Sequence, residues 1–147
     1  MKNIFTHILI ISLLFLPCSN ICAQQENAEN CLNYISNYTE YLKQNRHDDA
    51  ARWWRKAFEI CPVRIGHKFY LDGADIYRNI ALKSSNPSRG LLDTLVLLNT
   101  ARGLIYPEYL LESSKAVESD IILFASNNPE LRNHLLEEIK NVDPRFK

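Results

Sequence analysis

The segment from Cys31 to Pro62, CLNYISNYTEYLKQNRHDDAARWWRKAFEICP, constrains the fold more than any other part of the chain. It contains two helical patterns joined by a short polar break, with a cysteine at each outer end. Cys31 lies fifteen residues before Arg46, the centre of the break, and Cys61 lies fifteen residues after it. If the two halves fold back on each other as antiparallel helices, both cysteines arrive at the same end of the hairpin. We therefore predict an N-terminal helical hairpin with its two cysteines side by side.

The N-terminal residues have the pattern of an export signal. Lys2 gives a basic start, residues 8–16 are nearly all apolar, and a small, polar exit ends at Ala23. The apolar core of about nine residues is much shorter than the ~20 residues that a helix needs to span a bilayer. We expect a secretory signal peptide at residues 1–23, cleaved after Ala23, and no membrane span afterwards. A retained membrane anchor and a lipidated N-terminus are the alternatives.

Export bears on the cysteines and on the compartment. Cleavage leaves Cys31 and Cys61 out of the four cysteines, and an even pair in an exported chain predicts a disulfide. The formal net charge of the whole chain is +0, so charge does not favour nucleic acid or an anionic membrane as a partner. We expect the periplasm or cell envelope of a Gram-negative bacterium, with secretion as the alternative.

The rest of the chain indicates helices almost throughout. Residues 24–29 are polar and predict a disordered lead-in, and residues 143–147 predict a polar tail. Within residues 30–142 apolar residues recur at three- and four-residue spacing, which is typical of helices with one buried stripe. We predict an all-α domain, a right-handed stack of about three antiparallel helical hairpins. The expected helices span about residues 30–44, 48–61, 69–83, 88–104, 109–124 and 129–142.

The first hairpin also carries a repeat signature, strongest over residues 31–64. Counted from Cys31 as the first position of a unit of about 34 residues, the signature positions for aromatic, small and proline residues are filled. These residues are Tyr34, Tyr41, Ala50, Trp54, Ala57 and Pro62. The unit resembles the tetratricopeptide repeat (TPR), and later units match the pattern less well. The resemblance implies a TPR-like α-solenoid.

Other stretches make the whole chain similar to exported bacterial TPR proteins, of which it looks like a short version. They include residues 38–41, 58–62 and 70–73. This resemblance implies an envelope protein built for protein contacts, without an attached catalytic activity.

Four residues are the candidate contacts to a partner. In TPR proteins the first helix of each pair lines the concave surface, which makes Tyr38, Lys43 and Arg52 candidates. Trp53 directly precedes Trp54, which fills a position of the repeat signature, so the two side chains point about 100° apart on a helix. Trp53 therefore either packs into the next layer or serves as an aromatic anchor for a partner.

The sequence contains no pattern typical of a catalytic or metal site. After signal cleavage no CxxC remains, the histidines are isolated, and no glycine-rich phosphate loop occurs. We expect no cofactor, no metal and no enzyme activity. The predicted function is an exported helical-repeat scaffold that binds another envelope protein or peptide, with its oligomeric state open.

Two alternatives to this function stay open. The first is a structural subunit of an envelope complex, which would hold no exchangeable ligand. The second is a small secreted hydrolase that uses the carboxylates of Glu112, Glu118 and Asp120, in a cleft between the second and third hairpins. Two of these acids could serve as catalytic acid and base only in a buried cleft that makes their pKa values differ.

Overall fold

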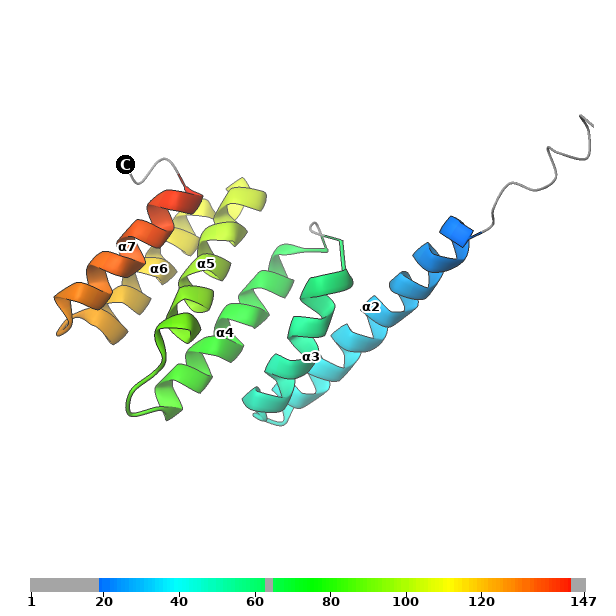
Figure 1. Cartoon of the computed structure of the whole chain (residues 1–147), viewed down its shortest axis with the longest axis horizontal. Coiled ribbons are helices and arrows are strands. Elements are labelled where there is room, and N and C mark those ends of the chain that lie inside the picture. The colour runs from blue at the N-terminus through cyan, green and yellow to red at the C-terminus, as the bar shows by residue number, and fades with distance from the viewer. Residues whose placement is uncertain (1–18, 63–64, 144–147) are drawn as a thin grey trace, which may run out of the picture.

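A computed structural model describes residues 19–62 and 65–143, and within them the chain is helical, with no strand (Figure 1). The all-α class predicted from the sequence is confirmed. The helices are α2 (Ser19–Lys43), α3 (His47–Ile60), α4 (His67–Lys83), α5 (Arg89–Ile105), the 3-10 helix η1 (Pro107–Tyr109), α6 (Leu110–Ala125) and α7 (Pro129–Val142).

The helix ends follow the local sequence. Side-chain oxygens of Ser88 and Asn128 accept hydrogen bonds from backbone N–H groups in the first turns of α5 and α7. Such caps satisfy donors that have no partner inside the helix. Asn45 adopts a φ of 56° in the turn between α2 and α3, and Gly66 a φ of 138° just before α4. Asparagine and glycine are the residues that tolerate a positive φ best, so these turns suit their sequence.

The N-terminal helix begins earlier than the sequence predicted. Residues 24–29, expected as a disordered lead-in, lie inside α2, which runs unbroken from Ser19 to Lys43. This stretch contains neither glycine nor proline, and its Ala, Gln and Glu residues are good helix formers. The N-terminal part of α2 projects past α3 (Figure 1). The expected signal peptide at residues 1–23 lies mostly outside the described residues.

The C-terminal boundary also differs. Asp143, expected to open a polar tail, is 1% exposed. Its backbone N–H donates to the carbonyl of Ile139 and so closes the last turn of α7. Residues 144–147, the rest of the expected tail, lie outside the described residues.

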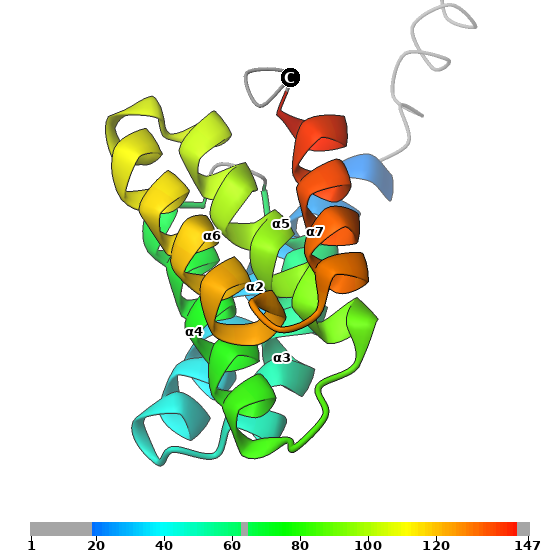
Figure 2. The ribbon, with the colours of Figure 1, turned by 90° about the vertical axis from the view of Figure 1, so that its left-hand side faces the viewer.

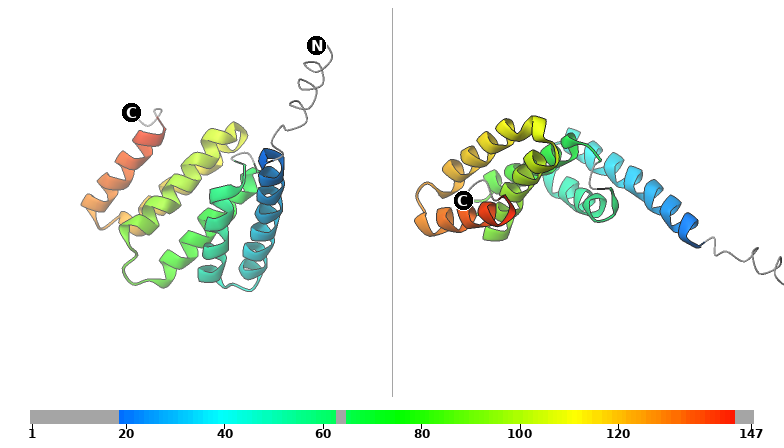
Figure 3. Two further views of the ribbon diagram at one scale, coloured as in Figure 1. Left: turned by 45° about the vertical axis from the view of Figure 1, so that its right-hand side comes forward. Right: turned by 90° about the horizontal axis from the view of Figure 1, so that it is seen from above.

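The helices pack as successive neighbours along one direction (Figures 1 and 3). α2 pairs with α3 and α4 pairs with α5, and α3 packs on α4. The last part is arranged differently, because α6 and α7 both lie against α5 and contact each other less (Figure 2). The expected third hairpin is therefore looser than the first two.

The core of the first part is built on Trp54. Its ring contacts those of Phe58 and Phe69, with centroids 5.0 Å away in each case, and its Nε1 donates to the Phe69 carbonyl at 2.9 Å. A Cβ placed on Gly73 of α4 would lie 2.5 Å from the Trp54 ring. Glycine at that position therefore lets α4 approach α3 closely, with the indole between them.

Successive helical pairs follow each other at more than 34 residues, because α3 and α5 begin 42 residues apart, at His47 and Arg89, and α4 and α6 begin 43 residues apart, at His67 and Leu110. The Tyr38 hydroxyl of α2 donates to the Asp72 carboxylate of α4 at 3.2 Å, a separation of 34 residues. Arg78 of α4 pairs with Asp120 of α6 at 2.7 Å, a separation of 42 residues. This longer step explains why the units after the first match a pattern of about 34 residues poorly.

Candidate functional site

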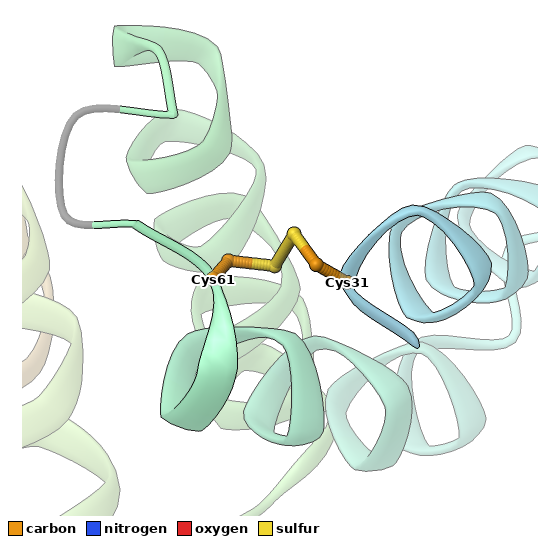
Figure 4. Close-up of a disulfide and its surroundings, with 2 residues drawn as sticks. All are labelled: Cys31 and Cys61. Carbon is orange, nitrogen blue, oxygen red and sulfur yellow. A yellow bond between two sulfur atoms is a disulfide. The ribbon is translucent and has the colours of Figure 1, made fainter. Parts of the chain in front are cut away.

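The two cysteines meet at one end of the first hairpin. Cys31 belongs to α2 and Cys61 directly follows α3, and their Sγ atoms lie 2.10 Å apart (Figure 4). The prediction that the hairpin brings them to the same end is confirmed. At this position the bridge holds the outer end of α3 against α2, and the Cys31 side chain is buried. Its role in the described structure is to close the hairpin.

Tyr38, the first of the four predicted partner contacts, is a packing residue. It is 3% exposed, and its hydroxyl bonds to Asp72, whose other carboxylate oxygen accepts from Lys68 at 2.6 Å. Burial, and then the negative charge of Asp72, raise the pKa of the Tyr38 phenol above its ordinary value. The side chain thus joins α2 to α4 rather than facing a partner.

Trp53 packs within the first hairpin and is partly exposed. Its ring lies 5.7 Å from the ring of Tyr34 on α2, measured between centroids, and Nζ of Lys56 lies 4.3 Å from the Trp53 ring. The two roles predicted for Trp53 are therefore not exclusive, because one part of the indole contacts α2 and another remains accessible.

Lys43 and Arg52 are exposed and are each paired with an acid of their own helix. Lys43 lies 3.9 Å from Glu40, and Arg52 lies 3.0 Å from Asp49. Exposed pairs of this kind contribute little to stability, so both cations remain accessible. None of the four predicted contact residues lines the groove described below.

The three carboxylates of the hydrolase alternative have different surroundings. Asp120 is 2% exposed and accepts two hydrogen bonds from Arg78, at 2.7 and 3.0 Å. These bonds raise the pKa of Arg78. Glu112 accepts a bond from the buried guanidinium of Arg102 at 3.0 Å. Of the three acids only Glu118 lines the groove, so no two of them share it.

An open groove of about 570 Å³ lies between α6 and α7, and we call it the α6–α7 groove. Its floor is apolar and consists of Val117, Ile121, Leu136 and Ile139. Two exposed apolar side chains of α6 extend this surface towards solvent, Leu111 at 69% and Ile122 at 60% exposure. The groove exists because α6 and α7 both pack on α5 more than on each other, which leaves a space along their outer sides.

The rim of the α6–α7 groove carries charge on both walls. Lys115 and Glu118 belong to α6, and Arg132 belongs to α7. Within residues 19–62 and 65–143, none of these three side chains takes part in an ion pair. The rim therefore has one excess positive charge and two cations that are not neutralised by the protein itself.

Sequence reasoning missed this groove, although α6 contains a signal for it. The run Ile121-Ile122-Leu123-Phe124 places apolar side chains all around the helix, whereas a helix with one buried face needs only a stripe. The structure buries Ile121 and leaves Ile122 and Leu123 exposed. Two adjacent exposed apolar residues next to a buried one indicate a surface that a partner can cover.

The described residues contain neither a cluster of metal ligands nor a membrane-spanning helix. No three His, Cys, Asp or Glu side chains of the described chain lie close enough together to hold a metal ion. No helix in this part of the chain has the length and apolar character needed to cross a membrane. Comparison with family models, with curated proteins and with solved structures finds no match to this chain.

Proposed function

We propose that this protein is an exported, TPR-like helical scaffold of the cell envelope that binds another protein or a peptide and catalyses no reaction. Its support is the succession of helical pairs, the repeat signature of the first hairpin, and the closure of that hairpin by Cys31 and Cys61. A pair at disulfide distance agrees with an oxidising compartment such as the periplasm.

The observation that carries this proposal is the α6–α7 groove. It is an open apolar surface with a charged rim, and exposed apolar surface of this kind marks the place where a soluble protein meets a partner. Helical proteins commonly bind an amphipathic segment in a groove between two helices. Binding there would need little rearrangement, because α6 and α7 are already held apart by α5.

This proposal moves the expected contact surface from the first part of the chain to the last. Tyr38 is buried, and Trp53 is partly occupied by Tyr34 and Lys56. By contrast, Leu111 and Ile122 are large apolar side chains more exposed than either of them. The first hairpin then serves as the rigid end of the scaffold and the last pair as its binding end.

Site-directed photocrosslinking in the native cell tests the proposed function. A photoreactive residue at Ile122 should capture a distinct protein, whereas the same residue at exposed Glu59 of α3 should not. The captured band should disappear when Leu111→Ser is added, because Leu111 lines the same groove and is too exposed to matter for folding. Identical bands from both positions, or a band insensitive to Leu111→Ser, would contradict a binding role for this groove.

A further inference from the structure

We propose that the α6–α7 groove accepts one amphipathic α-helix of a partner protein, whose apolar stripe is flanked by acidic residues. This inference rests on the proposed function and specifies the chemistry of the partner. It follows from the length of the groove, the pattern along α6 and the charges on the two walls.

The length of the groove suits a helical segment. On α6 the lining runs from Leu111 to Ser126, and fifteen steps at a rise of 1.5 Å span about 22 Å. The opposite wall is formed by α7 from Arg132 to Ile139. A helix of about four turns laid along α6 would meet α7 over about two of its turns and would complete a bundle of the kind in which helices pack 8–10 Å apart.

The residues of α6 that face the groove form two stripes. Ser114, Val117 and Ile121 make the inner stripe. Leu111, Lys115, Glu118 and Ile122 follow each other at spacings of four, three and four residues and make the outer stripe. The outer stripe is apolar at both ends and charged in the middle. A partner helix with apolar residues at every third or fourth position would cover both apolar ends at once.

The charges on the groove rim predict which residues flank the apolar stripe of the partner helix. Lys115 and Arg132 stand on opposite walls of the groove, and neither pairs with an acid in the described residues. Elsewhere on α7, Glu130 pairs with Arg89 and Glu137 with Lys140, while Glu138 forms no such pair among the described residues and does not line the groove. Two cations against the single acid Glu118 leave the rim with one excess positive charge, which favours acidic residues beside the partner's apolar stripe.

A concave groove favours a helix over a membrane surface as the occupant. Proteins that bind a bilayer through helices insert the convex apolar face of a helix between the headgroups. Here Val117 and Ile139 lie at the bottom of a groove, behind Leu111 and Ile122. A bilayer would touch the exposed pair and leave the floor uncovered, whereas a helix can fill the space.

Fluorescence anisotropy with synthetic helical peptides tests the inference. The purified protein, with its cysteines oxidised, is titrated against two labelled peptides of about eighteen residues that share one leucine stripe. Glutamates flank the stripe in one peptide and lysines in the other. The acidic peptide should bind at least tenfold more tightly, and the preference should shrink as salt is raised from about 50 to 500 mM, because salt screens exposed charges.

Matched variants assign the effect to the groove. Lys115→Glu combined with Arg132→Glu should abolish or reverse the preference for the acidic peptide. Lys43→Glu combined with Arg52→Glu changes the net charge equally at exposed positions of the first hairpin and should leave the preference intact. If the second pair removes binding and the first does not, the groove is not the binding site.

The remaining outcomes each overturn the inference in a distinguishable way. Equal binding of both peptides would contradict the preference for acidic flanks, although a helix would still bind in the groove. Binding to vesicles of anionic lipid, lost with Lys115→Glu and Arg132→Glu, in place of peptide binding would make the surface a membrane contact. A concentration-dependent dimer whose only crosslink from Ile122 is to a second copy would make it a self-association surface. If neither peptide binds while Ile122 captures a partner, the inference fails and the proposed function stands; if nothing is captured either, both fail.

Discussion

The apolar faces of the first helical pair are covered more completely than those of the last helical pair. The first pair folds α2 directly against α3, fills the space towards α4 with the Trp54 indole, and joins Cys31 to Cys61 at its outer end. The last pair has no such closure, since α6 and α7 each pack on α5 and contact each other less. The helices around Trp54 therefore form a closed core at one end of the molecule, with Leu32 and Phe58 exposed on its surface, and the last pair leaves an open groove at the other end.

This difference separates the residues that hold the molecule together from those that can meet a partner. In the first part Trp54 stacks on Phe58 and Phe69 and bonds to a backbone carbonyl, and of these three rings only that of Phe58 is largely exposed. In the last part the α6–α7 groove exposes Leu111 and Ile122, and no aromatic ring lines it. Substitutions should therefore affect stability most at the first end and binding most at the second.

The largest effect on stability should come from Trp54→Ala. This change removes a fully buried indole, its stacking partners and a hydrogen bond, and should lower the free energy of unfolding by roughly 3–5 kcal/mol. The neighbouring Trp53→Ala should lower it by only about 1–2 kcal/mol, because Trp53 is partly exposed and contacts mainly Tyr34. Urea unfolding followed by circular dichroism compares the two. Equal losses would contradict the concentration of stability around Trp54.

Replacing both cysteines should have the next largest effect. The Cys31–Cys61 bridge closes a loop with a sequence separation of 30 residues. On the loop-entropy model the double change to serine should lower the free energy of unfolding by about 3–4 kcal/mol. The oxidised wild type serves as reference, and wild type treated with a reductant should behave like the double variant.

Hydrogen exchange shows which helices are destabilised when the disulfide is lost. Amide exchange should speed up in α2 and α3 and stay unchanged in α6 and α7, since stacked helical units contact only their neighbours. If α7 exchanges faster to the same extent as α2, the two ends are not independent and the contrast between them is wrong.

The first hairpin was readable from sequence because its evidence is local. Cys31, Arg46 and Cys61 give its symmetry, the apolar spacing gives its faces, and Gly and Pro lie outside its helices. The start of α2 was not readable in the same way. Polar residues such as those at 24–29 are compatible with either a helix or a frayed end, and propensity alone is a weak guide.

The groove and the true length of the unit depend on contacts that no local pattern encodes. Period counting from Cys31 assumed a unit of about 34 residues, whereas α3 and α5 begin 42 residues apart. One of the four partner candidates, Tyr38, was misjudged for the same reason. It was expected on the outward surface of its helix, yet it is buried against α4, where Asp72 accepts a hydrogen bond from its hydroxyl. Which of two apolar neighbours on α6 is covered depends on how α5 carries α6 and α7, which is a tertiary property.

Three glycine substitutions measure how closely helices approach at the two ends. Gly73→Ala should destabilise by about 1–3 kcal/mol, because the new Cβ would lie 2.5 Å from the rigid Trp54 ring. Gly103→Ala, at the α5–α6 contact, should have a smaller effect, because Cβ of Ser113 lies 3.1 Å away and small shifts relieve the contact. Gly90→Ala meets nothing within 4 Å and should stabilise by up to about 1 kcal/mol through helix propensity.

The order of the free energies of unfolding of the three glycine variants tests how tightly the two ends are packed. Thermal or urea unfolding should rank the variants with Gly73→Ala least stable and Gly90→Ala most stable. If Gly103→Ala proves the more damaging of the two buried changes, the last part of the molecule is packed more tightly than the first, and the contrast between the ends is reversed.

The smallest predicted effect is that of Tyr38→Phe, and its pH dependence identifies the cause. At pH 7 the change removes one hydrogen bond to Asp72 and should lower the free energy of unfolding by about 1 kcal/mol. Burial and the Asp72 charge raise the Tyr38 pKa above its ordinary 10.0 in the folded protein. The unfolded chain therefore loses the phenol proton first as pH rises, so this group's contribution is complete below about pH 10 and is lost above it.

The difference in the free energy of unfolding between the wild type and Tyr38→Phe should accordingly become smaller at alkaline pH. Burial also raises the pKa of Tyr70 and Tyr77, so both proteins weaken with alkali, but only the wild type carries the additional contribution of Tyr38, at most about 1.4 kcal/mol per pH unit. Urea unfolding between pH 7 and pH 11 should show the stability gap narrowing above pH 10. A gap that stays constant across this range would mean that the Tyr38 hydroxyl ionises as readily in the folded protein as in the unfolded chain. Tyr38 would then belong with the accessible residues, and the first helical pair would be less completely sealed than its buried core indicates.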